Sequence, residues 1–361
     1  MSRHYIIPIF VPHFGCPHDC VFCNQKKITG LSTNVQASEV EEIIGEHLKT
    51  FKSNSYIEVA FYGGSFTAID LEIQKQLLSI PYKYKREGRI NAIRLSTRPD
   101  CIDDTILKNL KTYLVDTIEL GIQSLDNDVL EKSGRGHTNE DMYIASNLIK
   151  KYGFNLGLQM MVGLPLDTFE KSLYTCNEFI KLNPYCVRIY PTLIIKDTYL
   201  EKLFLEGEYS SISLEDAVYR SSILLMMFEI NEIDVIRIGL QPTENIQLGK
   251  DVVAGPFHPA FRQLVETNIY KMLLDYYFEI NNLNLLDEKL IIEASSKKIS
   301  SIAGQKSSNI KYFTERYKLK KMKIYSKLID NSYICITIGE FYDKINMKSL
   351  MKSYLESNFM I

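Results

Sequence analysis

The chain has 361 residues, of which 24% are charged and 45% hydrophobic, and its formal net charge is −2. This composition excludes an intrinsically disordered chain, and no uninterrupted apolar run has the length of a membrane span. The seven cysteines are an odd number spread over a long chain, which excludes a small disulfide-stapled domain. The apolar run 6–11 is too short for a secretory signal and is interrupted by Pro8, so we expect a cytoplasmic protein in a reducing compartment.

Short β-rich runs alternate with amphipathic helical stretches from residue 5 to about residue 240. Helices are expected at Glu39–Phe51, Phe169–Leu182 and Leu214–Ile230, each after a capping residue (Ser38, Asp167 and Ser213). This alternation predicts an α/β protein with a parallel sheet and helices outside it. Six such units predict a barrel or partial barrel, to which Val235–Ile238 adds a possible strand. The expected strands are Tyr5–Val11, Tyr56–Tyr62, Ala92–Ser96, Thr117–Ile122, Asn155–Met161 and Val187–Tyr190.

The character of the sequence changes after about residue 250, so we expect a barrel domain at 1–250 and a C-terminal extension at 251–361. A helix is expected at Ala260–Glu279, followed by a linker at Asn281–Asn284. The remainder is Lys-rich and predicts a small α+β basic module. Its expected elements are strands at Lys289–Ile292, Lys321–Tyr325 and Tyr333–Ile338 and a helix at Lys311–Tyr317.

Residues suited to binding and catalysis follow the expected barrel strands, where the active site of such barrels lies. Three cysteines follow the first strand as Cys16-Pro-His-Asp-Cys20-Val-Phe-Cys23. Further along the chain, polar or glycine-rich segments follow the second to fifth strands. These segments are Gly63-Gly64-Ser65-Phe66-Thr67, Thr97-Arg98-Pro99-Asp100, Gln123-Ser124 and Gly163-Leu164-Pro165.

The three clustered cysteines admit three interpretations. Zinc would need a fourth ligand, for which His13 and His18 are the nearby candidates. A redox-active cysteine pair would need a thioredoxin-like fold. Three thiolates on the loop after the first barrel strand favour a [4Fe-4S] cluster whose fourth iron is open to a substrate, so Cys16, Cys20 and Cys23 are the expected metal ligands.

This cysteine spacing, on this loop, resembles that of the radical S-adenosylmethionine (SAM) superfamily. The resemblance implies a partial (β/α)6-type barrel in which SAM binds the open iron and is cleaved reductively to a 5′-deoxyadenosyl radical. A low-potential donor such as flavodoxin or ferredoxin would supply the electron. The SAM-binding positions that the resemblance implies are Phe22, Gly63, Gly64, Ser65, Arg98, Gln123, Ser124 and Met160, with Ser65 standing where many relatives carry Glu.

Longer strings resemble the radical-SAM half of the Elongator catalytic subunit, a tRNA-modifying acetyltransferase. They include Phe61–Thr67, Ser96–Asp100, Glu119–Ser124, Arg135–Thr138 and Arg188–Ile195. That subunit usually spaces its first two cysteines more widely. It also carries an acetyltransferase domain that residues 251–361 are too few to hold, so acetyl transfer is not expected of this chain.

The segment 297–327 holds ten Lys/Arg residues and one acid, Glu315. Within it, Gly304-Gln-Lys-Ser307 and the flanking pattern resemble a K-homology RNA-binding module whose second loop glycine is replaced by Ser307. We therefore expect RNA, and tRNA in particular, as the partner of this segment; the alternative is an ordinary solvated lysine-rich face.

Three further residues are weaker candidates for the chemistry. Tyr190 ends the last barrel strand, His137 lies in the Arg135–Thr138 string, and His258 sits in a turn. The sequence thus predicts a radical-SAM enzyme acting on RNA, with no membrane partner. Two alternatives stay open: a radical-SAM enzyme acting on a small molecule, as coproporphyrinogen oxidase relatives do, or a non-catalytic iron–sulfur RNA-binding protein.

Overall fold

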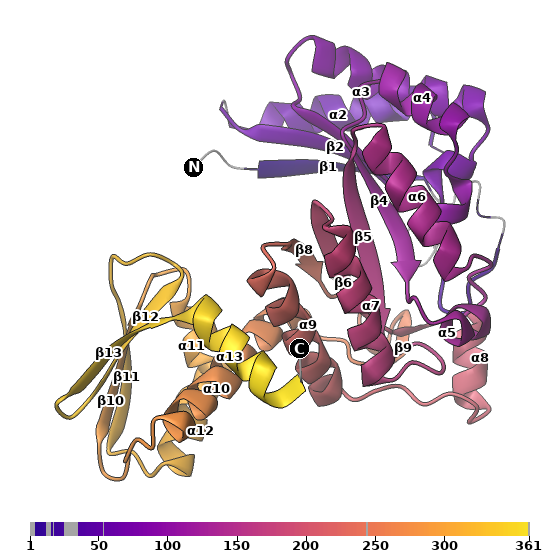
Figure 1. Cartoon of the computed structure of the whole chain (residues 1–361). Helices are drawn as coiled ribbons and strands as arrows, with labels where there is room; N and C mark the ends of the chain where they lie inside the picture. The colour runs from indigo at the N-terminus through magenta and orange to yellow at the C-terminus, as the bar shows by residue number, and fades with distance from the viewer. Residues whose placement is uncertain are drawn as a thin grey trace. The chain divides into compact units, whose positions relative to one another are not determined.

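The computed structural model describes residues 4–11, 16, 18–24, 35–52, 54–242 and 245–359. The chain forms two compact units: residues 1–212 with 240–257, and residues 213–239 with 258–361 (Figure 1). Among the described residues, no helix has both the length and the apolarity needed to cross a lipid bilayer.

The main sheet is parallel and has the strand order β1-β2-β3-β4-β5-β6-β8. Successive strands along the chain are neighbours, as in a sheet that curls toward a barrel, so the predicted α/β partial barrel is confirmed. Each predicted strand lies within one or two residues of an observed one. The strands are β1 (His4–Val11), β2 (Tyr56–Gly63), β3 (Ala92–Thr97), β4 (Thr117–Gln123), β5 (Asn155–Val162), β6 (Cys186–Pro191) and β8 (Asp234–Ile238).

The helices of the first unit connect these strands in turn. Their bounds are α2 (Ala37–Thr50), α3 (Leu71–Arg86), α4 (Asp104–Thr112), α5 (Asn127–Lys132), α6 (Asn139–Lys151), α7 (Phe169–Leu182) and α8 (Tyr199–Leu205), with short 3-10 turns η1 (Phe66–Ala68) and η2 (Pro99–Cys101). Two caps differ from the prediction. Helix α2 begins after Gln36, whose backbone N–H donates to Glu39, and α7 begins after Thr168, whose hydroxyl accepts from the N–H of Lys171. The carboxylate of Asp167 instead accepts a hydrogen bond from the hydroxyl of Ser172.

The two faces of the main sheet differ in chemistry. Alternate residues of the strands, such as Phe61, Leu95, Leu120 and Leu158, are fully or almost fully buried apolar side chains under the helices. The residues between them face the other side of the pleat, and many are polar. The polar face carries Glu58, Tyr62, Arg94, Ser96, Glu119, Gln159, Arg188 and Tyr190. The barrel interior is therefore polar, which suits it to bind a ligand.

A short two-stranded sheet completes the first unit. It pairs β7 (Ile194–Ile195) with β9 (Val252–Ala254) in antiparallel fashion. Gly255 follows β9 with a φ of 113°, and a Cβ there would stand 3.0 Å from the carbonyl oxygen of Thr192. This close approach explains why glycine opens the predicted turn at 255–259.

The second unit packs helices against one face of a four-stranded sheet of order β11-β10-β12-β13. Strands β10 and β11 are parallel, whereas β12 is antiparallel to both of its neighbours, β10 and β13. The predicted helices and strands of this region are all present. The elements are α9 (Leu214–Ile230), α10 (Phe261–Ile280), β10 (Lys289–Ala294), α11 (Ile299–Ala303), η3 (Gln305–Ser307), α12 (Ser308–Arg316), β11 (Lys321–Ser326), β12 (Tyr333–Ile338), β13 (Phe341–Asn346) and α13 (Met347–Phe359).

Candidate active site

A pocket lies at the carboxyl ends of the barrel strands, where the sequence predicted the site. It brings together residues from the loops after β1 to β4 and from the strands themselves. The lining residues are Cys16, His18, Asp19, Cys20, Phe22, Cys23, Gly63, Gly64, Ser96, Thr97, Arg98, Gly121, Gln123, Arg135 and Gln159. Eight of the predicted site residues thus lie on one pocket, including all three cysteines.

The sulfur of Cys20 lies against two guanidinium groups. Arg135 Nη1 donates to Cys20 Sγ at 3.1 Å, and Arg98 Nη1 lies 4.0 Å from the same sulfur. Arg135 is held in turn, because its Nη2 donates to the carbonyl of Gly121 and its own carbonyl accepts from Arg98 Nη2. Two cationic donors thus lie beside the sulfur of one predicted cluster ligand.

Each of the three cysteines is partly exposed and lines the pocket. Burial, followed by the nearby Cys20 thiol, raises the pKa of Cys16, while Arg98 and Arg135 act in the opposite direction. The cysteine segment contains a turn in which the backbone N–H of Cys23 donates to the carbonyl of Cys20 at 3.0 Å. His13 lies outside the described residues, and His18 lines the pocket.

The glycine segment after β2 packs against the end of β1. Gly63 has a φ of 107°, and a Cβ there would lie 2.7 Å from the carbonyl oxygen of Val11, so only glycine fits. The N–H of Gly64 donates to that same oxygen at 2.9 Å. Ser65 is fully buried and does not line the pocket; its hydroxyl bonds Thr97 Oγ1 at 2.8 Å and ties the second loop to the third.

Arg98 lies on the pocket, but its guanidinium already has partners. Its Nε donates to Asp100 at 2.9 Å, and its Nη2 donates to Asp100 at 3.1 Å. The structure therefore gives Arg98 two neighbours that the sequence did not, the carbonyl of Arg135 and the sulfur of Cys20. Contact with SAM stays a prediction for this residue.

Gln123 ends β4 in a strained conformation. Its φ is 75°, and the pairing of β4 with β5 shifts register between Gly121 and Gln123. Strain of this kind costs a non-glycine residue about 1–3 kcal/mol and is concentrated at functional sites. Its side-chain oxygen is buried and accepts no hydrogen bond from any described residue, which leaves an acceptor available to a bound donor group. The neighbouring Ser124 is buried and accepts from the N–H of Asp126 at 3.2 Å.

Of the remaining predicted residues, Phe22 lines the pocket, whereas Met160, Tyr190 and His137 do not. Phe22 lines the pocket and packs on an apolar cluster that includes Leu200. Met160 is fully buried and Tyr190 is half-buried, and neither belongs to the lining. His137 is also buried; burial, followed by the charges of Arg135 and Arg98, lowers its pKa to about 3, so its ring is neutral near pH 7.

Arg135 and Gln159 line the pocket but were not predicted as site residues, and Arg135 was named only as the first residue of the Arg135–Thr138 string. Arg135 stands between Gly134 and Gly136, with φ values of 64° and 71°. A Cβ on Gly136 would come within 2.4 Å of the His18 ring, so the glycines let this loop approach the cysteine segment. An arginine flanked by two glycines was the available signal. Gln159 had none, because it reads as one residue of an apolar strand.

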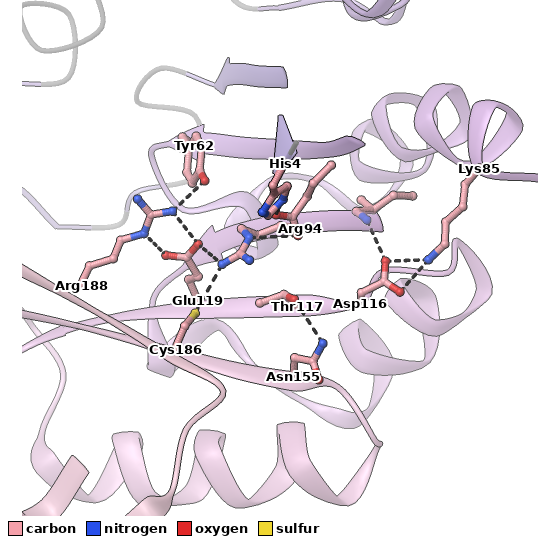
Figure 2. Close-up of polar contacts among 12 residues, drawn as sticks. His4, Tyr62, Lys85, Arg94, Asp116, Thr117, Glu119, Asn155, Cys186 and Arg188 are labelled. Atoms are coloured by element: carbon pink, nitrogen blue, oxygen red, sulfur yellow. Dashed lines mark hydrogen bonds and ion pairs between the residues drawn. The ribbon is translucent and has the colours of Figure 1, made fainter. Parts of the chain in front are cut away.

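A buried ionic network lies on the polar face of the sheet (Figure 2). Glu119 accepts from Arg94 Nη1 at 2.8 Å and from both Nε and Nη2 of Arg188. Arg94 Nε also lies 3.1 Å from Glu58, and Arg188 Nη2 donates to the hydroxyl of Tyr62 at 2.7 Å. Two acids thus balance two bases, which a buried site needs.

Gln159 connects this network to the pocket. Its Nε2 donates to Glu119 Oε2 at 3.1 Å and lies 3.4 Å from the hydroxyl of Ser96, a second pocket residue. Although burial acts to raise the pKa of Glu119, the guanidinium groups of Arg188 and Arg94 hold it below its usual value. A charged Glu119 therefore orients the Gln159 amide at the base of the pocket.

Comparison with protein families identifies the class of protein that has this fold and site. The model of the radical SAM superfamily matches residues 10–175, and that of the radical SAM C-terminal domain matches residues 184–271. The first match contains every pocket-lining residue. The chain belongs to the radical SAM superfamily and is a radical SAM enzyme, as the cysteine spacing predicted.

The most similar relatives include Elongator-type proteins. The tRNA uridine(34) acetyltransferase of Methanocaldococcus jannaschii is 30% identical over 182 residues, and human Elongator complex protein 3 is 28% identical over 182 residues. Both alignments cover 45% of this chain, but only 34% and 33% of those proteins, so the chain spans about a third of their length. An uncharacterised M. jannaschii protein is 27% identical over 225 residues, which are 58% of this chain and 68% of that protein.

A solved structure extends the similarity to most of the chain. Methanocaldococcus infernus Elp3 with an N-terminal deletion matches with a TM-score of 0.58 at 17% identity, over 97% of this chain and 76% of that one. At this identity the match establishes a shared fold. The predicted Elongator-like radical-SAM resemblance is confirmed by these relatives.

The pocket fits the cofactors that this family uses, a [4Fe-4S] cluster and SAM. Three cysteines line it, cationic donors face Cys20, and the side-chain oxygen of Gln123 has no hydrogen bond from the described residues. Within the described ranges, no three Cys, His, Asp or Glu side chains converge on a single ion. Each cysteine of such a cluster binds a different iron, so the three sulfurs need not converge on one ion.

Proposed function

We propose that this radical SAM enzyme modifies RNA, and that its substrate is a tRNA. The observation that carries the proposal is the pairing of the cysteine pocket with relatives named as tRNA uridine(34) acetyltransferases. The lysine-rich segment 297–327 adds support, because positive charge attracts a phosphate backbone.

Each group of pocket residues has its own proposed role in binding the cluster and SAM. Cys16, Cys20 and Cys23 would hold the cluster, which when bound would supply the electron that cleaves the SAM sulfonium. Arg135 donates to the Cys20 sulfur, and the buried side-chain oxygen of Gln123 would accept a hydrogen bond from SAM. Gly63 and Gly64 leave room for the methionine portion of SAM to approach the backbone.

The test separates the radical chemistry from the substrate. The anaerobically reconstituted and reduced protein is incubated with SAM, with and without bulk tRNA, and 5′-deoxyadenosine is quantified. We expect cleavage in both samples and faster cleavage with tRNA, together with a new nucleoside in digests of the recovered tRNA. Cleavage that tRNA does not accelerate, with no altered nucleoside, would contradict an RNA substrate and favour a small molecule.

A further inference from the structure

The four-stranded sheet of the second unit carries helices on one face, where α10 to α13 gather (Figure 1). The side chains directed to those helices are apolar and buried, among them Leu290, Ile292, Ile334, Ile336 and Ile345. Because side chains alternate along a strand, the intervening residues share the opposite face. We call these residues the open face: Lys289, Ile291, Glu293, Lys321, Lys323, Tyr325, Tyr333, Cys335, Thr337, Tyr342, Lys344 and Asn346. Cys335 among them is buried, and its sulfur accepts from the Tyr342 hydroxyl at 3.3 Å.

Strand register arranges the open face in rows across the sheet. One row runs Lys323, Ile291, Thr337, Tyr342, and the next runs Tyr325, Glu293, Cys335, Lys344. Each row therefore has a tyrosine at one edge strand and a lysine at the other. The two tyrosines lie on the edge strands β11 and β13, about 14 Å apart across the strands and one row apart along them.

The tyrosine rings are unusually accessible for residues in a sheet. Tyr325 is 44% exposed and Tyr342 is 57% exposed, while Tyr333 is half-buried. Lysines lie close to two of these rings: Lys323 Nζ is 5.8 Å from the Tyr325 centroid, and Lys344 Nζ is 4.5 Å from the Tyr333 centroid. Aromatic faces beside ammonium groups are what a nucleobase joined to a phosphate would contact.

The charge of the open face is strongly positive. Lys289, Lys321, Lys323 and Lys344 lie on it, and the acid that register places there, Glu293, is bonded to Lys327 Nζ at 2.6 Å. The rest of the lysine-rich segment is divided among helices and loops. Arg316 there pairs with Asp275 and Glu279, which offsets its charge.

We propose that the open face binds single-stranded RNA, with bases stacked on Tyr325 and Tyr342 and phosphates beside the lysines. This deepens the proposed function and rests on its choice of RNA as the substrate. An RNA duplex keeps its bases stacked inside, so an exposed aromatic pair favours single-stranded segments such as tRNA loops. The loop 304–307, which the sequence likened to that of a K-homology module, is not part of the open face. Its Lys306 and Ser307 have φ values of 50° and 60°.

The test measures binding by the full reconstituted chain under anaerobic conditions. A short fluorescein-labelled single-stranded RNA is titrated and followed by anisotropy at several salt concentrations. Because stacking on one aromatic ring changes affinity by about 5- to 100-fold, Y325A/Y342A should weaken binding by at least fivefold. Y325F/Y342F should retain it, since the ring remains. K323Q/K344Q should weaken binding and flatten its salt dependence.

Matched controls separate stacking from general charge and from unfolding. Y185A/Y199A removes two tyrosines of similar exposure, 58% and 56%, from the first unit and should bind normally. Heparin, which has charge but no bases, should bind Y325A/Y342A as tightly as the unaltered chain. Far-UV circular dichroism and SAM cleavage without RNA should be unchanged in every variant.

Three results would overturn the proposal. The first is equal RNA affinity for Y325A/Y342A and the unaltered chain, which leaves the proposed function standing with RNA bound elsewhere. The second is tighter binding of duplex than of single-stranded RNA. The third is no RNA binding by the unaltered chain. This last result removes the RNA substrate as well, while 5′-deoxyadenosine formation reports separately on the radical SAM activity.

Discussion

At the scale of single residues, Cys20 and Cys335 have different surroundings. The sulfur of Cys20 lies beside two guanidinium groups. Cys335 is buried within a strand of the second unit, and its sulfur accepts from the Tyr342 hydroxyl. Cys20 lines the pocket beside cationic donors, whereas Cys335 lies in the other unit.

We therefore expect Cys20→Ala to abolish the brown iron–sulfur chromophore after anaerobic reconstitution, because two remaining thiols cannot hold the cluster. Cys335→Ala, the matched control, should keep it. Iron and sulfide content and the visible absorption spectrum check this expectation. A full chromophore in Cys20→Ala would refute the ligand assignment.

His137 gives a pH dependence at the same scale. Its folded pKa of about 3 lies below the ordinary value near 6.5, so the unfolded chain binds the proton more readily. Its contribution to stability is complete above about pH 6.5 and falls as the pH drops toward 3. We expect His137→Asn, which does not titrate, to lose less stability than the unaltered chain between pH 7 and pH 5. Urea midpoints measure this difference, and equal losses in the two proteins would contradict it.

At the scale of elements, strands β2, β3, β4 and β6 are joined through the buried network around Glu119 (Figure 2). A buried acid that balances two arginines stabilises the fold mainly because its removal leaves unpaired charge. Register makes this possible, since Ser96, Glu119 and Gly157 lie in one row across three strands. The small Gly157 leaves room for the Glu119 side chain, whose Cγ would lie 2.7 Å from a Cβ at that position.

Glu119→Gln should lower the free energy of unfolding by about 3–5 kcal/mol, because Arg188 would lose its acidic partner and Arg94 would keep only Glu58. Urea denaturation measures the change. The control is Glu72→Gln, which removes an exposed helical partner of Lys75 and should leave the midpoint unaltered. A Glu119→Gln variant as stable as the control would show that the network is dispensable.

At the scale of the whole molecule, the second unit is assembled from two stretches of sequence. The domain boundary expected near residue 250 separates α9 from α10 along the chain. The hydroxyl of Ser222 on α9 nevertheless donates to the carbonyl of Val265 on α10 at 3.2 Å. Arg262 at the start of α10 donates to the carbonyl of Val235 in β8 at 2.7 Å. The apolar side of α9 is therefore covered by residues far along the chain.

A chain that ends at Phe257 should consequently lack a stable α9, since its buried residues lose their cover. We expect increased binding of a hydrophobic dye and a broadened thermal transition relative to the full chain. Ser222→Ala in the full chain, which removes one hydrogen bond only, should keep a sharp transition. A sharply melting fragment that binds no dye would contradict this account.

The sequence by itself determined the order of strands and helices, the cysteine loop and the family. These features depend on local periodicity and on residues close together in the chain, and the strand bounds accordingly agreed to within one or two residues. It also placed Gly63, Arg98 and Gln123 at one end of the barrel, because the ends of parallel strands meet there.

Only the tertiary structure decided which distant side chains meet. Arg135 donates to Cys20, from which it is 115 residues away in the sequence, and Arg188 donates to Glu119, from which it is 69 residues away. A single lysine-rich segment was divided between helices and one strand of an open sheet. Such contacts depend on strand register and helix packing, which bring together residues whose separation along the chain carries no local signal.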